Sequence, residues 1–505
     1  MTRAYISLNG EWTFHGPNGS VEQVNIPHTW NGKDGQDGGN DYWRGTCTYE
    51  KNFRQPEFDS EKQRVYLEFQ GVNSTADVEI NGNLAVHHDG GYSTFRADIT
   101  EMLQEENRLT VRVDNSTNDR VYPQKADFTF YGGIYRDVAL IVVSQNHFDL
   151  DYFGGIKITP KLEKGCGKIH VETFVTGTGT VEISLLDAKG NQVASGEGQD
   201  IILDIPNAHL WNGLEDPYLY RAVARLVKSG EGVDQGEDHF GVRVFEVDPK
   251  KGFFLNGRSY PLRGVCRHQD RPGIGNAISQ AIHEEDMALI REIGANTIRL
   301  AHYQHDQYFY DLCDKYGLIV WAEIPYISEH MPSGRENTIS QMTELIVQNY
   351  NHPSIVCWGV SNEITISTKN KRDMLDNHRA LNDLCHRLDP TRFTTLACYA
   401  MCGPFNRSAH ITDVVSWNLY LGWYVPGLWL NDMWVKFFHT VYPNRCLGFS
   451  EYGCEAMPNL HASHPRRGDH TEEYQCVYHE YMLRFFDRNP WMWGTHVWNM
   501  FDFAA

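Results

Sequence analysis

The sequence predicts a multidomain protein with two β-sandwiches followed by a (β/α)8 barrel. Three observations predict this architecture. The chain has 505 residues, which is too long for one ordinary hydrophobic core. Short alternating runs with glycine-rich turns fill its first half, and strand-like runs alternate with helical stretches in its second half. We therefore place the three domains at residues 1–145, 146–248 and 249–505.

Composition excludes several classes of protein. A hydrophobic fraction of 41% supports well-filled cores, which excludes a disordered chain. The formal charge of −20 and the lack of a basic stripe argue against a nucleic-acid partner. No run of 18 apolar residues is present, so we expect no membrane span. The segment "MTRAYISLNGEW" has no apolar signal region, so we expect a cytoplasmic protein.

The cysteines also indicate a reducing compartment. Their number, 11, is odd, and several lie inside apolar runs, where a reduced thiol packs as a small hydrophobic group. Cys398 and Cys402 have a CxxxC spacing, but no second pair completes a zinc site. We therefore expect no metal at these two cysteines.

The two predicted sandwiches differ in the pattern and spacing of their strand-like runs. In the first, alternating runs such as 63–72 and 107–115 are separated by Asn-Gly and Asp-Gly-Gly turns. In the second, runs such as 167–175 and 220–230 are spaced as in a small immunoglobulin-like sandwich. The second region has no Cys–Trp–Cys core, so we expect a non-antibody variant that supports its neighbours.

The third region predicts a closed barrel, because parallel strands joined by crossover helices fit a (β/α)8 arrangement. The expected helices are 279–293, 305–316, 335–350, 371–388 and 471–487. The expected strands are 261–268, 295–303, 318–325, 354–363, 393–400, 414–420, 446–453 and 493–503. The eighth strand ends the chain, and a closed barrel needs one more helix, so we expect a truncated version of a longer protein.

Polar residues follow nearly every predicted barrel strand, and barrel enzymes carry their working residues at the carboxyl ends of the strands. We expect these side chains to meet at one mouth. They are Arg267, His268, His302, Tyr303, Glu323, Glu329, His330, Asn362, Glu363, Asn418, Tyr420, Glu451, Tyr452, Trp498 and Asp502.

Two of these carboxylates, Glu363 and Glu451, follow strands four and seven, which face each other across a barrel. Retaining glycoside hydrolysis needs such a facing pair about 5–5.5 Å apart, one as nucleophile and one as acid and then base. We interpret Glu323 as a positioning group. Aromatic faces pack on sugar rings, and we expect a lining from Trp358, Trp417, Tyr420, Trp423, Tyr424, Trp491, Trp493 and Trp498.

Several longer motifs resemble the family-two glycoside hydrolases, which include β-galactosidases and β-glucuronidases. The resemblance covers essentially the whole chain. Its motifs are "FYGGIYRDV" (130–138), "LWNGLEDPYLY" (210–220), "GVRVFEV" (241–247), "LNGRSYPLRGVCRHQDRPGIG" (255–275), "NHPSIVCWGVSNE" (351–363) and "GFSEYG" (448–453). The resemblance implies a jelly-roll sugar-binding sandwich, an immunoglobulin-like sandwich and a TIM barrel.

The resemblance also implies roles for individual residues. Glu363 corresponds to the acid/base and Glu451 to the nucleophile. The implied sugar-binding residues are Asn362 for the 2-hydroxyl, His268 and His302 for other hydroxyls, Tyr420 beside the nucleophile, Trp498 as the aromatic floor, and Asp127 from the first sandwich.

Two departures from the family pattern affect these expectations. In the large bacterial β-galactosidases a Glu-x-His pair helps to hold magnesium, but here Ser328 stands two residues before His330. We therefore predict no metal and no cofactor, with magnesium doubtful. Cys454 replaces a histidine of those enzymes, which suggests a differently built sugar pocket.

The sequence leaves the sugar open. β-Glucuronidases carry an Asn-x-Lys element after the eighth strand, and this chain stops at "WNMFDFAA". We predict a retaining exo-β-galactosidase that acts on a β-linked oligosaccharide or glycoside, and we expect a homo-oligomer. The alternative is a β-glucuronidase or β-galacturonidase on the same scaffold. More remote alternatives are a non-catalytic carbohydrate-binding protein and a structural scaffold.

Overall fold

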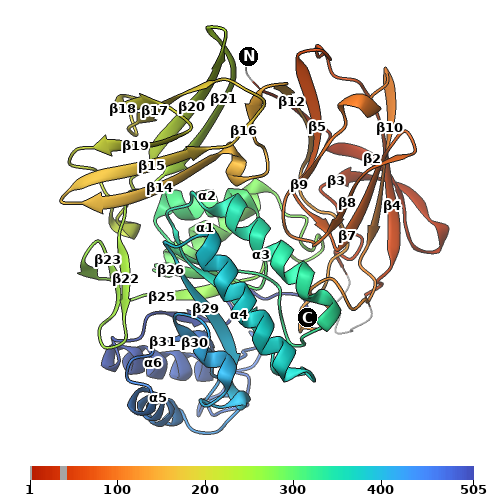
Figure 1. Ribbon diagram of the computed structural model, residues 1–505. Helices are drawn as coiled ribbons and strands as arrows, with labels where there is room; N and C mark the ends of the chain where they lie inside the picture. The colour runs from red at the N-terminus through yellow and green to blue at the C-terminus, as the bar shows by residue number, and fades with distance from the viewer. Residues whose placement is uncertain (1–2, 34–41) are drawn as a thin grey trace.

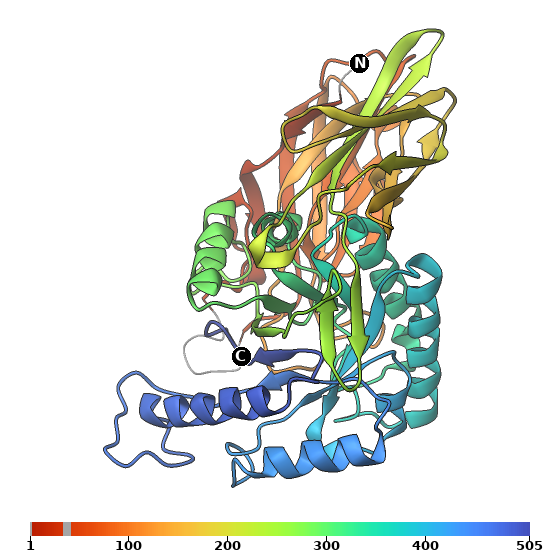
Figure 2. The same ribbon diagram turned by 90° about the vertical axis from the view of Figure 1, so that its left-hand side faces the viewer.

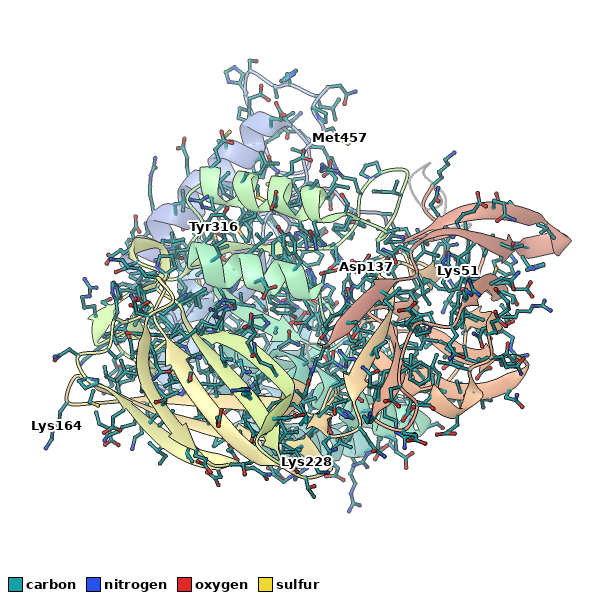
Figure 3. The ribbon with its side chains drawn as sticks, turned by 90° about the horizontal axis from the view of Figure 1, so that it is seen from above. Lys51, Asp137, Lys164, Lys228, Tyr316 and Met457 are labelled. Carbon is teal, nitrogen blue, oxygen red and sulfur yellow. The ribbon has the colours of Figure 1, made fainter. Side chains whose placement is uncertain are left out.

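The computed structural model describes residues 3–33 and 42–505. Its strands form two β-sandwiches and one closed barrel of eight parallel strands, which confirms the predicted fold class. Figure 1 shows the two sandwiches side by side above the barrel, and Figure 2 shows the same stacking from the side. In Figure 3, Lys51 lies on the first sandwich, Lys164 and Lys228 on the second, and Tyr316 and Met457 on the barrel domain.

The first sandwich has alternating strands whose inward side chains form one core. In β10 (Glu106–Asp114), for example, Leu109, Val111 and Val113 are buried while their neighbours face outward. One sheet has the order β3 (Val21–Ile26), β2 (Gly10–His15), β4 (Thr46–Arg54), β10, β7 (Thr75–Ile80), β8 (Asn83–Asp89). The other has the order β1 (Ala4–Ser7), β12 (Val138–Ser144), β5 (Gln63–Phe69), β9 (Phe95–Asp98), and β11 (Gly133–Ile134) pairs with β6 (Val72–Asn73).

The second sandwich has its own core, which includes Ile169, Val171 and Leu226. One sheet has the order β14 (Ile156–Glu163), β15 (Cys166–Thr173), β19 (Asp200–Ile205). The other has the order β18 (Gln192–Glu197), β17 (Thr180–Leu186), β20 (Tyr220–Lys228), β21 (Glu231–Phe240), and β13 (His147–Phe148) pairs with β16 (Val175–Thr176). A small sheet of β22 (Phe245–Asp248), β23 (Gly252–Leu255) and β24 (Arg258–Ser259) follows this sandwich.

The barrel strands are buried almost throughout, as expected for parallel strands covered on both faces. In chain order they are β25 (Arg263–Arg267), β26 (Thr297–Leu300), β27 (Ile319–Glu323), β28 (Ile355–Asn362), β29 (Phe393–Tyr399), β30 (Val415–Asn418), β31 (Leu447–Tyr452) and β32 (Thr495–Val497). The helices are α1 (Gln280–Glu292), α2 (Gln307–Tyr316), α3 (Arg335–Asn349), α4 (Lys371–Leu388), α5 (Leu430–Val441) and α6 (Glu472–Arg488).

Local sequence signals explain where these helices begin and end. Asp306 caps α2 by accepting a hydrogen bond from the Tyr308 amide, and Thr471 caps α6 in the same way through Tyr474. Gly317 ends α2 in the left-handed region, at a φ of 79°. The five helices predicted from the sequence are all present within two residues of the expected bounds.

Two features of the barrel differ from the sequence prediction. Helix α5 was not predicted, because its segment "LNDMWVKFFHTV" is rich in aromatic and β-branched residues. Between β29 and β30 the structure has two short 3-10 turns, η6 (Ala400–Cys402) and η7 (Arg407–His410), in place of a crossover α-helix. The chain after β29 therefore stays at the mouth of the barrel.

The first sandwich is fixed to the barrel by a buried polar and aromatic interface. Arg136 donates 2.9 Å to the carbonyl of Gln304, and the amide of Tyr122 donates 2.9 Å to Asn337. Phe128 is buried against the rings of His268 and His302. This interface holds the segment around Phe128 over the carboxyl ends of the barrel strands.

Among the described residues, no helix is both long and apolar enough to span a bilayer.

Candidate active site

A cavity of about 350 Å³ lies at the carboxyl ends of the barrel strands. Seven of the eight site residues predicted from the sequence line it, and His268 does not. The lining residues are Asp127, His302, Asn362, Glu363, Tyr399, Ala400, Met401, Asn418, Tyr420, Leu421, Tyr424, Val425, Glu451 and Trp498. The structure thus brings together side chains from the first sandwich and from six barrel strands or the loops that follow them.

Glu451 lies near the end of β31 and is held by two donors. Nη1 of Arg299 lies 2.7 Å from Oε1, and the Tyr420 hydroxyl donates to Oε2 at 2.7 Å. Burial raises the pKa of Glu451, whereas the charge of Arg299 and both hydrogen bonds oppose that rise. Both oxygens therefore have partners that stabilise the anion.

Glu363 follows β28 directly and has a different environment. Its backbone lies in the left-handed region at a φ of 46°, which few residues with a Cβ adopt. Its carboxyl group accepts a hydrogen bond of 2.9 Å from the Asn418 amide. Burial and the nearby charge of Glu451 raise the pKa of Glu363 to about 8. Glu363 therefore holds a proton at neutral pH.

Asn418 connects the two carboxylates. It ends β30, where its Cα pairs in register with that of Glu451, and its side-chain amide donates to Glu363. The Ser450 hydroxyl donates 2.6 Å to Asn418, which fixes the orientation of the amide. Arg299 and Tyr420 favour the anion of Glu451, whereas burial and the charge of Glu451 favour the protonated form of Glu363, which is the division that double displacement at a sugar requires.

Arg299 was not predicted from the sequence, yet it organises the base of the site. This fully buried guanidinium contacts Glu323 at 2.8 and 3.0 Å and Asn362 at 2.9 Å, in addition to Glu451. Glu323 is the positioning group that the sequence predicted, and it does not line the cavity. A Cβ on Gly359 would collide with Glu323 and Trp321, so the glycine in β28 makes room for this ion pair.

His302 and Trp498 form one wall. Their rings stack with centroids 4.9 Å apart, and Nδ1 of His302 lies 3.0 Å from Oε1 of Glu323. Burial and the charge of Arg299 lower the pKa of His302 well below its usual value, so the ring is neutral. The same Nδ1 lies 3.1 Å from Nη2 of Arg299, and the neutral ring offers one donor and one acceptor nitrogen.

His268 lies behind this wall. Its ring stacks on Phe503 at 4.4 Å and meets Trp498 edge-on at 5.3 Å. Its Nε2 atom is buried without a hydrogen-bond partner among the described residues. His268 does not line the cavity, and its contact with the substrate stays a prediction.

Asp127 reaches the cavity from the first sandwich, as predicted. Its side chain is exposed, whereas the adjacent Phe128 is buried against the barrel histidines. The charge of Asp127 contributes to the raised pKa of Glu363. Asp127 therefore lies at the open side of the cavity and acts on its electrostatics.

The aromatic lining differs from the prediction. Trp358, Trp417 and Trp493 are at most 1% exposed, belong to the hydrophobic core and do not line the cavity. The cavity instead takes its rings from Tyr399, Tyr420, Tyr424 and Trp498. Tyr399 was not predicted, because no pattern in the sequence indicates that the chain after β29 stays at the mouth.

The residues expected for magnesium do not form a ligand set. Ser328 stands in the position of the glutamate, and both ring nitrogens of His330 are hydrogen-bonded, at 2.7 Å to Tyr326 and at 2.7 Å to Asp373. Cys454 is buried and does not line the cavity. No chemical step is therefore assigned to a metal here.

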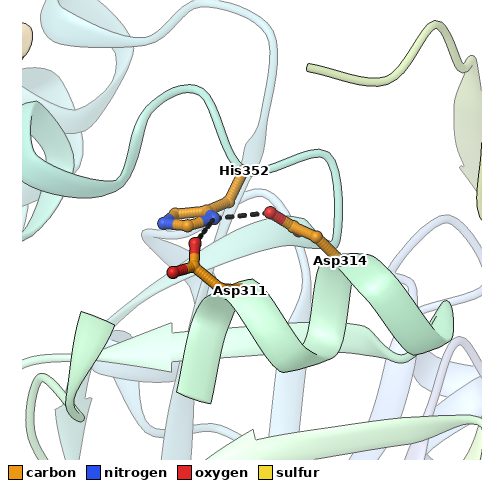
Figure 4. A group of neighbouring side chains, drawn as sticks. All are labelled: Asp311, Asp314 and His352. Atoms are coloured by element: carbon orange, nitrogen blue, oxygen red, sulfur yellow. Dashed lines mark hydrogen bonds and ion pairs between the residues drawn. The ribbon is translucent and has the colours of Figure 1, made fainter. Parts of the chain in front are cut away.

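One group with metal-ligating side chains lies elsewhere in the part of the chain that the structure describes. It consists of Asp311 and Asp314 on α2 and His352 before β28 (Figure 4). Nδ1 of His352 lies 2.6 Å from Asp314, and the surrounding carboxylates raise the pKa of His352 to about 9 despite its burial. The histidine is therefore protonated, and the group is an ion pair that joins α2 to the barrel.

Comparison with known families gives three adjoining matches. The family described as "Glycosyl hydrolases family 2, TIM barrel domain" matches residues 245–505. The family's sugar-binding domain matches residues 37–144, and a third family-2 domain matches residues 152–243. These matches confirm the resemblance that the sequence motifs indicated.

Individual relatives carry two names. A β-glucuronidase of Bacteroides fragilis is 39% identical over 100% of this chain and 76% of its own length. A β-galactosidase of Thermoanaerobacter pseudethanolicus is 28% identical over 82% of this chain and 56% of its own length. The relatives thus carry both of the names that the family resemblance implied.

Solved structures agree with the fold. A crystal structure of an FMN-binding β-glucuronidase from Facaelibacterium prausnitzii L2-6 has a TM-score of 0.96 and 46% identity, covering 99% of this chain and 80% of the other. A putative β-galactosidase from Bacteroides fragilis has a TM-score of 0.93 and 35% identity, covering 100% of this chain and 80% of the other.

Proposed function

The chain belongs to glycosyl hydrolase family 2, and we propose that it removes terminal β-D-glucuronic acid from glycosides with retention of configuration. The names of its relatives support glucuronide over galactoside as the substrate. The observation that carries the mechanism is the placement of Glu363 and Glu451 in one cavity, each bound by different partners.

In the first step Glu451 attacks the anomeric carbon and forms a glycosyl-enzyme. Arg299 and Tyr420 keep Glu451 ionised before the attack. Glu363 donates its proton to the departing oxygen, which its raised pKa of about 8 permits at neutral pH.

In the second step Glu363 acts as a base. Glu363 is ionised after giving its proton to the departing oxygen, and bond formation at Glu451 removes the negative charge that, together with burial, raised the pKa of Glu363. Glu363 then accepts a proton from the attacking water. The water attacks the anomeric carbon and releases the sugar. We expect Asn362, which Arg299 holds at 2.9 Å, to bond the 2-hydroxyl group.

One observation favours the β-galactoside as a second candidate. The described residues that line the cavity include three carboxylates, Asp127, Glu363 and Glu451. No lysine or arginine is among these lining residues. A glucuronide carboxylate needs a cationic or strong donor partner, whereas galactose does not. Binding of a glucuronide would therefore need a partner outside this lining.

A side-by-side assay tests the proposal. Chromogenic β-glucuronide, β-galacturonide and β-galactoside are compared at equal concentration, with Glu363→Gln and Glu451→Gln as inactive controls. We expect the glucuronide to give the highest kcat/KM. A preference for the galactoside would overturn the proposed sugar and keep the mechanism. Sugar binding without hydrolysis would support a carbohydrate-binding protein, and no sugar-dependent shift in Tm would support a scaffold.

A further inference from the structure

Two cysteines flank a short stretch of the cavity wall. Cys398 lies in β29, and Cys402 ends the 3-10 turn η6 that follows it. All three residues between them, Tyr399, Ala400 and Met401, line the cavity. Met401 is 75% exposed, so this stretch forms the outer wall. Any change at the two cysteines therefore acts directly on the wall.

The two thiols are reduced and in contact. A side-chain hydrogen bond joins Cys398 and Cys402, although neither takes part in a disulfide. Cys398 is 2% exposed, whereas Cys402 is half-buried. The backbone amide of Glu363 donates 2.9 Å to the carbonyl of Ala397, the residue before Cys398. The pair therefore lies beside the strand end that carries the proposed acid/base.

The two thiols differ in reactivity. Burial raises the pKa of the Cys398 thiol well above its usual value. The hydrogen bond from Cys398 lowers the pKa of the Cys402 thiol. The more exposed cysteine is thus the better source of thiolate, which is the nucleophile in disulfide exchange, and the buried one is placed to react second.

We propose that Cys398 and Cys402 are a redox modification site, at which a small-molecule disulfide such as oxidised glutathione converts the two thiols into one intramolecular disulfide. The Cys402 thiolate attacks one sulfur of oxidised glutathione, forms a mixed disulfide and releases one glutathione thiolate. Cys398 then loses its proton to solvent and attacks the Cys402 sulfur, which releases the second glutathione. Two protein thiols are oxidised and one glutathione disulfide is reduced.

The disulfide closes a ring of five residues, Cys398 to Cys402, around the cavity wall. Disulfide geometry fixes the distance between the two Cβ atoms, so the three residues inside the ring cannot keep their present freedom. Glu363 follows β28 and Glu451 lies on β31, and the partners of their carboxyl groups, Asn418 and Arg299, lie outside this ring. We expect the modified enzyme to handle large leaving groups poorly while its chemistry on the sugar is unchanged.

The test uses the full chain. Enzyme reduced with dithiothreitol is treated with oxidised glutathione, the remaining thiols are alkylated, and peptides are mapped by mass spectrometry. The structure predicts a linkage between Cys398 and Cys402 that dithiothreitol reverses. Absence of this linkage, with alkylated Cys402 recovered after treatment, would overturn the proposal.

Activity provides the second readout and rests on the proposed function. We expect oxidation to lower kcat/KM for an aryl glycoside by roughly tenfold, because a small misplacement of the wall disturbs the leaving group. Hydrolysis of the matching glycosyl fluoride, whose leaving group is one atom, should stay unchanged. Equal rates before and after oxidation on both substrates would contradict the role of the wall.

Two variants complete the design. Cys402→Ser should abolish the effect of oxidation, and Cys476→Ser is the matched control, because Cys476 is an exposed cysteine on α6 and does not line the cavity. Persistent sensitivity of Cys402→Ser, or its loss in Cys476→Ser, would contradict the assignment. If no glycoside is hydrolysed at all, the proposed function fails, and the peptide map still tests the disulfide.

Discussion

Arg299 and Glu451 are joined by an ion pair of 2.7 Å between Nη1 and Oε1, although they lie on β26 and β31, on different sides of the barrel. The same guanidinium also contacts Glu323 and Asn362. One buried cation thus sets the position of the proposed nucleophile and of the amide beside the proposed acid. The predictions below start from this relationship.

Arg299→Lys keeps the positive charge and removes the planar guanidinium group with its several N–H donors. A lysine cannot contact Glu323, Asn362 and Glu451 at once, so we expect kcat/KM to fall by about 100-fold or more. The matched control is Arg267→Lys, because Arg267 is equally buried but pairs with Asp286 on α1. The control should lose stability and keep its activity per folded molecule. Similar activity losses in both variants would show that Arg299 is only structural.

The raised pKa of Glu363 predicts the alkaline limb of the pH profile. The proposed acid must be protonated, so kcat/KM should fall as pH rises through about 8. A highly activated leaving group departs without receiving a proton, so the pH profile of kcat/KM for such a substrate should lack this alkaline limb. The measurement is kcat/KM from pH 5 to 10 for one ordinary and one activated aryl glycoside. An alkaline limb shared by both substrates would assign it to another group.

Asp127→Asn should shift the same limb. The negative charge of Asp127 helps to raise the pKa of Glu363, so its removal should move the alkaline limb of kcat/KM to lower pH. Asp119→Asn is the control, because Asp119 is an exposed aspartate of the same sandwich that does not line the cavity. Equal pH profiles of kcat/KM for the two variants would contradict the effect of Asp127 on the site.

Tyr420→Phe removes a donor to the proposed nucleophile. The Tyr420 hydroxyl stabilises the Glu451 anion at 2.7 Å, so its loss should raise the pKa of Glu451 and move the acidic limb of kcat/KM to higher pH. We expect kcat to fall about 100-fold, as for loss of one preorganised donor. Tyr424→Phe is the control, since its hydroxyl contacts Glu455 at the rim. A wild-type pH profile for Tyr420→Phe would contradict this role.

Much of the fold could be predicted from the sequence because its signals are local. Alternating runs identified the sandwiches, and helical stretches between strand-like runs identified the barrel helices. Helix α5 was missed because Trp434, Phe437 and Phe438 give an aromatic segment without strong helix propensity. The missing crossover helix after β29 could not be foreseen, since barrel topology predicts one there.

The site was predictable where residues stand at strand ends and less so elsewhere. Glu363 and Glu451 follow strands that must meet at one mouth. Arg299 lies inside "TIRL", where a charged residue gives no sign of its partners Glu323, Asn362 and Glu451, because these come from other strands. The depth of a tryptophan along a strand is likewise set by packing, so Trp358 and Trp417 could not be assigned to the core from spacing alone.

The central claim is that Glu451 forms a covalent bond to the sugar while Glu363 serves as acid and base. A 2-deoxy-2-fluoro-β-glucuronyl fluoride slows release of the sugar and traps that intermediate. Mass mapping should place the sugar on Glu451 in wild-type enzyme and on no residue in Glu451→Gln. Attachment to Glu363 or Glu323, or turnover of the probe without any covalent adduct, would contradict the account.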